Sequence, residues 1–537
     1  MLMSGQDYRE SLKRYRPTIY VNGQQVSSDD PVLAPGVNGV AMTYDMALNE
    51  QYSTLMRAVG VDASSAAQAT VNRMMAIPRH SQDLLNKLEA VRLVCQETGC
   101  AQRYLGGDAL SAIWQHAHRL DADTGSQVLP RLQAYLQQVY GQDLTLGVAM
   151  TDAKGDRSRR PHEQAHPDSY LHIVDRDAKG IWISGTKAIV TGAPYMHELL
   201  VMPGRNMSEA EAACAVCCAV PIDAPGLTLV ARPAGRPGEK AALFSHRYGQ
   251  STAVALFDRV FVPFERVFLS GEWTHAGPLV YDYTSHHRHT CIAARAGFGD
   301  LLIGAGALMT EANGIDLDQS SNLREQMIEL IKIVEGFYAC GVAASVYVQT
   351  DARAQVAVPD PVFANIGKLL MATQIYDMHR IAHHVSGGLI VTLPGPDEDH
   401  NPMTAGRLSE VLTANSSVPY DKRIEVARFI EDLTASYQAG WYSVISLHGG
   451  GSPEAMKMEI WRHYPVGNKV DLVERLLERG ILTDETRKIT RNRQPGRCCE
   501  AGCMVPLPAP SAAPELHIPV SEVGRSASGV QGSAQHR

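Results

Sequence analysis

The segment from Ser285 to His289, SHHRH, holds the densest group of ionisable side chains in the chain. An imidazole changes its charge near neutral pH, so a histidine here could act as a base or as a hydrogen-bond partner of a substrate. The same residues could equally form the solvated start of a helix. The segment by itself leaves both interpretations open.

Two further segments combine residue types that contact ligands in proteins. Residues 149–157, AMTDAKGDR, join a strand-like end to a turn rich in backbone and hydroxyl donors. In residues 384–389, HVSGGL, paired glycines near a helix would let the backbone approach a ligand closely. For each segment, an ordinary surface turn or helix end explains the residues equally well.

Common nucleotide and metal signatures do not occur in the sequence. There is no strand-linked GxGxxG, no GxxxxGK[ST] phosphate loop and no HExxH zinc helix. Cys214, Cys217 and Cys218 resemble half of a metal site, but no second half follows at a suitable spacing. Because they lie in an apolar stretch, we expect buried free cysteines there, and we predict no metal site.

The elements that must position these residues follow a helix, strand, helix order. An apolar period near 3.6 predicts a helix over residues 81–100 with Ser81 as its N-cap. Residues 170–184 predict a hairpin around a glycine-ended turn. Further strands are expected at 198–202, 214–220, 227–231 and 253–262, and long helices near 290–313, 321–352, 361–386 and 421–447.

Composition excludes several classes of protein. A chain of 537 residues that is 45% hydrophobic can bury large cores, so it is not wholly disordered. A net charge of −8 without a basic domain argues against a nucleic-acid partner. The ten cysteines suit a reducing compartment, and no apolar stretch reaches the ~18 residues of a membrane span. We predict a soluble cytoplasmic protein without a membrane partner.

Many short stretches, in this order, resemble the 4-hydroxyphenylacetate 3-hydroxylase family, and within it the 4-hydroxybutyryl-CoA dehydratase branch. The resemblance covers roughly residues 1–485. The matching stretches are VAMTY (40–44), AMTD (149–152), KGD (154–156), GTKA (185–188), TG (191–192), VFVP (260–263), GFGD (297–300), GGLIV (387–391) and HGGGSP (448–453).

The resemblance implies an α+β fold like that of the acyl-CoA dehydrogenases. It would comprise an N-terminal helical domain (1–145), a central β domain (146–280) and a C-terminal helical bundle (281–485). Residues 486–537 are rich in Pro, Ser, Ala and Gly and are expected to form a disordered tail. The resemblance further implies a homotetramer, with FAD in the cleft between the β domain and the second helical domain.

The flavin contacts can be carried over position by position. Lys187 and Thr191 would lie beside the isoalloxazine ring, with a hydroxyl at its reactive edge. The paired glycines would let the backbone approach the cofactor, and the turn after the strand would contact its phosphates. The residues expected to contact FAD are therefore Ala149, Met150, Thr151, Lys154, Asp156, Lys187, Thr191, Gly387 and Gly388.

The sequence departs from the dehydratase branch where that branch binds its iron–sulfur cluster. The positions of its three cysteines and one histidine carry Cys100, Tyr104, His287 and Ala294. Neither tyrosine nor alanine replaces a thiolate on iron, so we expect no cluster. A shifted site of Cys100, His287 and Cys291 is the alternative. Cys95 would lie off the helical face of Cys100.

Groups with catalytic roles in both branches are also replaced. The positions of the proton-moving carboxylates and tyrosine of the dehydratase branch carry Thr252, Ile445 and Cys291. The positions at which the phenol-hydroxylating branch binds its substrate carry Leu105, Ala109 and Val148. The substrate is therefore not expected to be 4-hydroxyphenylacetate itself.

These departures favour a two-component monooxygenase that receives FADH2 from a separate flavin reductase and acts on a small organic substrate. His287, Tyr104 and Arg103 are the candidate catalytic residues, with His287 as a base or hydrogen-bond partner. The alternative is an FAD-dependent acyl-CoA dehydratase or isomerase. A third possibility is a flavin-binding protein without catalytic activity.

Overall fold

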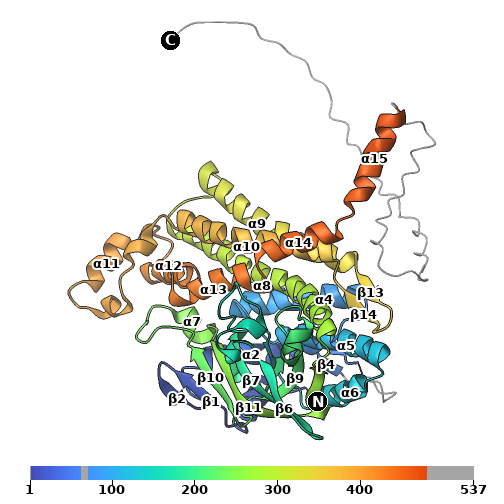
Figure 1. Cartoon of the computed structure of the whole chain (residues 1–537). Helices are drawn as coiled ribbons and strands as arrows, with labels where there is room; N and C mark the ends of the chain where they lie inside the picture. Colours follow the sequence, from blue (N-terminus) through green and yellow to red (C-terminus); the bar gives the residue numbers. More distant parts are fainter. Residues whose placement is uncertain (1, 62–69, 480–537) are drawn as a thin grey trace. The chain divides into compact units, whose positions relative to one another are not determined.

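The computed structural model describes residues 2–61 and 70–479 (Figure 1). Residues up to Tyr464 belong to one compact unit, and those from Pro465 to a second, of which helix α15 is described. The helices are α1 (Gly5–Leu12), α2 (Ala34–Leu48), α3 (Glu50–Met56), α4 (Ser81–Thr98), α5 (Tyr104–Thr124), α6 (Val128–Gly141), α7 (Leu243–Tyr248), α8 (Ala276–Ala312), α9 (Ser321–Val346), α10 (Pro361–Ser386), α11 (Ala405–Leu412), α12 (Tyr420–Thr434), α13 (Tyr437–His448), α14 (Pro453–His463) and α15 (Val466–Arg479).

Two sheets supply the β part of the first unit. One has six strands in the order β2-β1-β10-β11-β7-β6, and the other has four in the order β12-β9-β8-β5. Two-stranded hairpins β3-β4 and β13-β14 complete the set. The strands are β1 (Thr18–Val21), β2 (Gln24–Val26), β3 (Arg57–Val59), β4 (Thr70–Asn72), β5 (Leu146–Ala149), β6 (His172–Arg176), β7 (Gly180–Thr191), β8 (Glu198–Val201), β9 (Val216–Pro221), β10 (Leu227–Arg232), β11 (Thr252–Pro263), β12 (Val267–Ser270), β13 (Gln349–Asp351) and β14 (Val356–Val358).

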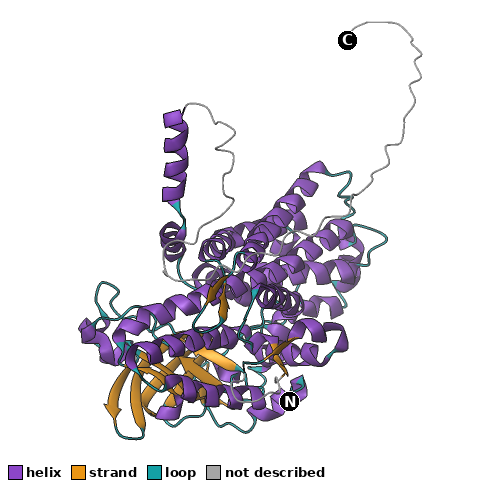
Figure 2. Cartoon of the chain, turned by 90° about the vertical axis from the view of Figure 1, so that its right-hand side faces the viewer, coloured by secondary structure: helices purple, strands orange, loops and turns teal. Residues whose placement is uncertain are grey.

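Three cores hold these layers together. Apolar residues of both large sheets, such as Ile183 and Leu199, share one core. A second core joins α5 and α6 to the four-stranded sheet. The largest lies among α4, α8, α9, α10, α12 and α13. Figure 2 shows the strands gathered together, with the long helices packed beside them.

Helix α8 is central to the helical part. It runs for 37 residues and packs against α4, α5, α9 and α10. By length and composition its segment could cross a membrane, but 61% of its most apolar window is buried within the protein. That is the environment of a core helix, where neighbouring helices cover the apolar surface.

The element order confirms most of the elements expected from the sequence. Strands β6 and β7 form the predicted antiparallel hairpin, and β8 to β11 overlap the four further strands. Helix α10 occupies the predicted range 361–386, where Pro361 begins it and Gly387, with φ +74°, ends it. The domain boundaries at 145, 280 and 485 remain predictions, and the tail 486–537 lies outside the described residues.

Several local expectations were wrong. The range 421–447 forms two helices, because Ser436 caps α13 by accepting from the backbone N–H groups of Gln438 and Ala439. Helix α9 ends at Val346 rather than 352. Ser81 is inside α4 rather than its N-cap, and its hydroxyl donates to the Ser345 carbonyl at 2.8 Å.

His197 connects the N-terminal helix to two strands. Its Nδ1 accepts from the backbone N–H of Thr145, before β5, at 2.8 Å, and its Nε2 lies 2.8 Å from the Ser11 hydroxyl of α1. Burial and the nearby charge of Arg103 lower the pKa of His197 to about 3. The folded protein therefore holds this ring neutral at physiological pH.

Acidification should consequently destabilise the protein through His197. The unfolded chain binds a proton at His197 near pH ~6.5, whereas the folded chain does so only near pH 3. The stabilisation is present above pH ~6.5 and is lost as the pH falls, by about 2 kcal/mol at pH 5. Denaturant unfolding of the parent and of His197→Asn at pH 7 and pH 5 measures this. Equal pH dependence in both proteins would contradict the assignment.

Candidate functional site

A cavity of about 60 Å³ lies where the start of α5, the end of β7, and helices α8, α10 and α13 meet. It brings together three residues predicted from the sequence, Tyr104, Thr191 and His287. Its full lining is Cys100, Gln102, Tyr104, Leu105, Thr191, His287, Cys291, Ala294, Arg295, Met371, Trp441, Ile445, Ser446 and Gly449.

The spacing along α8 explains why one helix supplies four of these residues. His287, Cys291, Ala294 and Arg295 stand at i, i+4, i+7 and i+8, which lie on one face of an α-helix. All four positions at which the resemblance implies cluster ligands in the dehydratase branch line this cavity. In this chain, two of those four positions carry Tyr104 and Ala294.

A hydrogen-bonded array runs from the cavity wall into the core. The Cys291 thiol lies 3.4 Å from His287 Nε2, and His287 Nδ1 lies 3.3 Å from an oxygen of Asp108. Asp108 also accepts from Lys87 at 2.8 Å and from the Thr290 hydroxyl at 2.6 Å. These contacts link α4, α5 and α8 through one fully buried carboxylate.

The array favours a charged pair at its cavity end. Burial alone would lower the pKa of His287, but the charge on Cys291 and the Asp108 carboxylate raise it to about 9. Burial alone would raise the pKa of Cys291, but His287 and then Lys368 lower it. The raised pKa makes His287 better suited to donate than to accept a proton at neutral pH, so of the two expected roles, base or hydrogen-bond partner, it favours the second.

A second thiol, Cys100, lies in the same cavity. A hydrogen bond from Cys95 and the charge of Arg295, against the effect of burial, lower the pKa of Cys100 to about 6. The expectation that Cys95 lies away from Cys100 was wrong. It assumed a continuous helix, whereas α4 ends at Thr98 and the chain turns at Gly99, with φ +68°.

Two polar groups of the cavity lack partners in the described part of the chain. Both polar atoms of the Gln102 side chain are buried without a hydrogen bond, and so is one nitrogen of the Arg295 guanidinium. The Tyr104 hydroxyl has only a long contact of 4.0 Å to the Cys100 sulfur. Buried polar atoms without partners are costly, so these groups are suited to meeting a ligand.

The histidine segment is not a solvated helix start. His286, His287 and His289 lie well inside α8, and all three are buried. Burial lowers the pKa of His286 to about 3 and that of His289 to about 4, so these two rings are neutral. Their ring nitrogens contact Gln115 at 2.9 Å and Ser345 at 2.7 Å, which gives them structural roles.

Lys187, which the resemblance places beside the isoalloxazine ring, is not among the residues that line the cavity. Its side chain is 2% exposed and pairs with Asp152 at 2.7 Å. It also donates to the carbonyl oxygens of Met150 and Met202 at 2.9 and 2.8 Å. Because an ammonium group has three N–H bonds, Lys187 is fully used in holding the segment after β5.

The remaining predicted flavin contacts lie outside the cavity lining. Ala149 ends β5 and is buried, whereas Met150 and Thr151 are half-buried. Lys154, with φ +72°, and Asp156 lie on an exposed turn. Gly387 and Gly388, with φ +74° and +76°, are exposed at the end of α10. Their conformation requires glycine, whether or not a ligand approaches.

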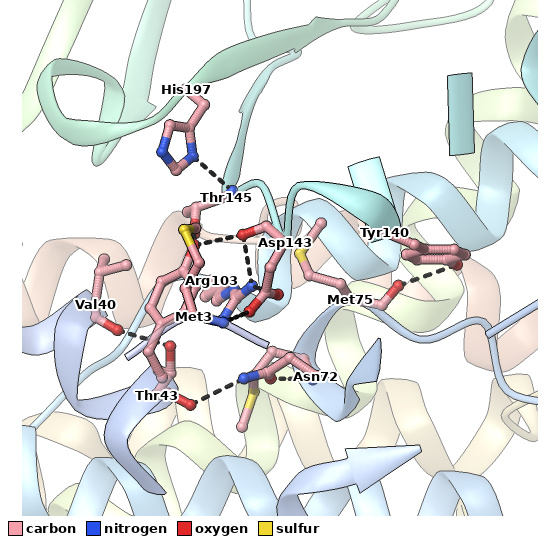
Figure 3. A network of polar contacts seen from close by, with 12 residues as sticks. Met3, Val40, Thr43, Asn72, Met75, Arg103, Tyr140, Asp143, Thr145 and His197 are labelled. Carbon is pink, nitrogen blue, oxygen red and sulfur yellow. Dashed lines mark hydrogen bonds and ion pairs between the residues drawn. The ribbon is translucent and has the colours of Figure 1, made fainter. Parts of the chain in front are cut away.

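Arg103 is not among the residues that line the cavity, and Figure 3 shows it beside Asp143 instead. Its guanidinium pairs with Asp143 and stacks over the ring of Tyr44 at 3.6 Å. It therefore fixes the loop between α6 and β5, and it does not join the other two candidate catalytic residues, Tyr104 and His287.

The sequence reasoning missed Gln102, Asp108 and Lys87 as members of this site. One signal was present, because Asp108 follows Tyr104 by four residues and so shares its helical face. The prediction of buried free cysteines is confirmed for Cys217 and Cys218 of β9, whereas Cys214, before that strand, is free but only partly buried. Cys498, Cys499 and Cys503 lie outside the described residues.

Comparison with known proteins gives matches over nearly the whole chain. Residues 4–269 match the N-terminal domain of 4-hydroxyphenylacetate 3-hydroxylase, and residues 276–478 match its C-terminal domain. The 4-hydroxybutyryl-CoA dehydratase/vinylacetyl-CoA-Δ-isomerase of Clostridium aminobutyricum is 32% identical, over 88% of this chain and 99% of that protein.

Two further matches represent both branches. The oxygenase component of 4-hydroxyphenylacetate 3-monooxygenase from Thermus thermophilus is 25% identical, over 89% of this chain and 97% of that protein. The solved structure of an oxygen-tolerant archaeal 4-hydroxybutyryl-CoA dehydratase from N. maritimus has a TM-score of 0.84 and 33% identity. It covers 90% of this chain and 96% of that one.

Removing the buried carboxylate should destabilise the fold strongly. Asp108→Ala leaves the charge of Lys87 buried without its partner, so we expect a loss of about 3–5 kcal/mol in the free energy of unfolding. Adding Lys87→Met removes that charge and should recover part of the loss. Urea unfolding of the parent and both variants measures this, and a loss below about 1 kcal/mol for Asp108→Ala would contradict it.

Proposed function

Because the chain belongs to the 4-hydroxyphenylacetate 3-hydroxylase family, we propose that it is an FADH2-dependent monooxygenase, fed by a separate flavin reductase. It would hydroxylate or oxidise a small organic substrate. The printed description of the Thermus relative as an oxygenase component supports the two-component organisation. A cytoplasmic homotetramer is proposed on the same family grounds.

The observation that carries this proposal is the composition of the cavity. Its wall holds Tyr104 and Ala294 where thiolate ligands of iron would be needed, and Ile445 where the resemblance implies a proton-moving carboxylate. None of the residues that line it is a carboxylate. Oxygen transfer to an electron-rich substrate requires a water-poor cavity with hydrogen-bond donors, and this lining supplies buried donors such as the Gln102 amide.

The residues present fit a flavin at one edge of the cavity. Gln102 carries a buried amide without a partner, and a Cβ added at Gly192 would lie 2.8 Å from its oxygen. The amide therefore lies beside the end of β7, where Thr191 also lines the cavity. An amide and a hydroxyl can satisfy the alternating donors and acceptors of a flavin ring edge.

Outside the cavity, Lys154 makes no ion pair among the described residues, so its charge is available to a phosphate. The exposed glycines at 387 and 388 would permit close backbone approach. Reduced FAD, when bound, would supply the electrons that activate O2.

The chain's own groups would bind and orient the substrate. Asp108 and Cys291 contact the two ring nitrogens of His287, so neither ring N–H is free to donate to a substrate. His287 would therefore act on a substrate through its positive charge. Tyr104 and the unpartnered nitrogen of Arg295 can bind substrate atoms. A protonated imidazole beside the pocket would stabilise a substrate in its anionic, more electron-rich form.

The second candidate is an FAD-dependent acyl-CoA dehydratase or isomerase. It is supported by 32% identity to the Clostridium enzyme and by the TM-score of 0.84 to the archaeal one. It would require an acid–base pair different from the one that the resemblance implies for that branch. Iron and acid-labile sulfide analysis of anaerobically purified protein distinguishes the candidates. Stoichiometric iron and sulfide with no O2-dependent product would favour the dehydratase.

Substitution of His287 should separate chemistry from cofactor binding. We expect His287→Ala to lower product formation by at least ~100-fold, because it removes the charge at the pocket wall, while binding of reduced FAD stays nearly unchanged. Tyr104→Phe should cost less, since it removes one hydroxyl and keeps the shape of the pocket. Steady-state turnover and flavin titration measure the two effects. Turnover of His287→Ala within a few-fold of the parent would exclude the catalytic role.

A further inference from the structure

Cys291 differs from the other cysteines of the described chain in its surroundings. It is only partly buried, it lines the cavity, and its sulfur lies 3.4 Å from His287 Nε2. His287 is in turn oriented by Asp108 at 3.3 Å. A thiol next to an imidazole that a third group orients is the arrangement that activates a nucleophilic cysteine.

The charges around Cys291 support the ionised form of the thiol. Lys368 on α10 and His287 on α8 carry positive charge near the sulfur, and Asp108 is the nearby carboxylate on α5. Asp108 accepts from three donors, so its own charge is largely balanced by Lys87 and His287. The thiolate is therefore matched by a net positive environment.

An independent observation indicates that the cavity takes a ligand. The Gln102 side chain is 1% exposed, lines the cavity and has no hydrogen-bond partner for either polar atom among the described residues. Leu105, Ala294 and Met371 supply an apolar part of the same wall. The Gln102 amide nitrogen could donate to the carbonyl oxygen of a bound molecule, and the apolar side chains could contact its carbon skeleton.

We propose that Cys291 is a nucleophile that forms a covalent adduct with a conjugated carbonyl compound bound in this cavity. The proposal is independent of the proposed monooxygenase activity, because it requires neither flavin nor O2. A soft, polarisable thiolate adds readily to the β-carbon of such a compound. The charge then develops on the carbonyl oxygen, where the Gln102 amide can stabilise it.

The step is balanced without any other reactant. The Cys291 sulfur forms a bond to the β-carbon, and the electron pair of the carbon–carbon double bond moves toward the carbonyl as an enolate. His287 then gives its Nε2 proton to the α-carbon. The net change is addition of S–H across the double bond, with no oxidation or reduction, and elimination reverses it.

The test uses N-ethylmaleimide, a conjugated dicarbonyl, on the full-length protein at pH 7. Cys340 on α9 is the internal control, because it is also partly buried but burial raises its pKa. After trypsin digestion, Cys291 falls in peptide 289–295, Cys340 in 333–353, and Cys95 with Cys100 in 93–103. Mass spectrometry then gives a separate labelling rate for each peptide.

We expect Cys291 to be labelled at least ~10-fold faster than Cys340, since an ordinary thiol is only a few per cent ionised at pH 7. In His287→Gln this advantage should disappear, whereas an unchanged rate at Cys340 shows that the fold persists. Gln102→Leu should slow labelling of Cys291 by a smaller factor. Equal rates at Cys291 and Cys340 in the parent, or preferential labelling of peptide 93–103, would overturn the proposal.

A second probe distinguishes conjugate addition from acyl transfer. p-Nitrophenyl acetate offers the same thiolate an acyl group. One outcome is that the parent protein releases p-nitrophenol faster than it adds maleimide, while Cys291→Ser releases none. That result would show that the ligand is an acyl donor and would overturn the assigned class of conjugated carbonyl compounds. Little or no release, with fast maleimide addition, supports it.

Discussion

The buried carboxylate of Asp108 is the group on which the geometry of the cavity depends. It has no exposed surface, and it accepts hydrogen bonds from Lys87 on α4 and from Thr290 and His287 on α8. A buried charge without these donors would be costly, so the three helices must keep a fixed relation to one another. That relation places the face of α8 that bears His287 and Cys291 at the cavity wall.

The same electrostatic logic applies to the second thiol. Cys100 lies near the buried guanidinium of Arg295, whose charge favours the thiolate, as His287 does for Cys291. Two cation–thiol pairs thus face one cavity, and each has one member, Cys100 or His287, at a position where the dehydratase branch is expected to bind iron. Fixed cations of this kind can stabilise thiolates in a buried site. The local charge is balanced by the protein itself.

Sequence reasoning identified the elements whose boundaries have local causes. Pro361 and Gly387 delimit α10 because backbone chemistry at those two positions is strongly constrained. The start of α8 was placed too late, at 290 instead of Ala276, because its polar residues interrupt the apolar pattern although partners bury them. Local spacing cannot show that a polar side chain will find a partner far along the chain.

The same limit explains the site residues. Sequence reasoning identified the cationic candidate residues but not the carboxylates that pair with them. Asp143 lies 40 residues from its partner Arg103, and Asp152 lies on a different segment from its partner Lys187. Each of these two cations was expected to contact a ligand, and each is instead paired with a carboxylate. His287 and Tyr104 were found because the resemblance carried them, whereas Gln102 has no distinguishing pattern. Its importance is visible only as a buried amide without a partner.

The protonation states of the cavity also bear on the choice between oxygenation and dehydration. Removal of an unactivated proton needs a strong base, and a thiolate with a lowered pKa is a weak one. His287 is already protonated, and Lys368, whose pKa burial lowers to about 8, donates to the Ser446 carbonyl at 2.8 Å. None of these three groups is therefore a strong base at neutral pH. Removal of a proton from an unactivated carbon requires such a base, whereas transfer of oxygen to an electron-rich substrate does not.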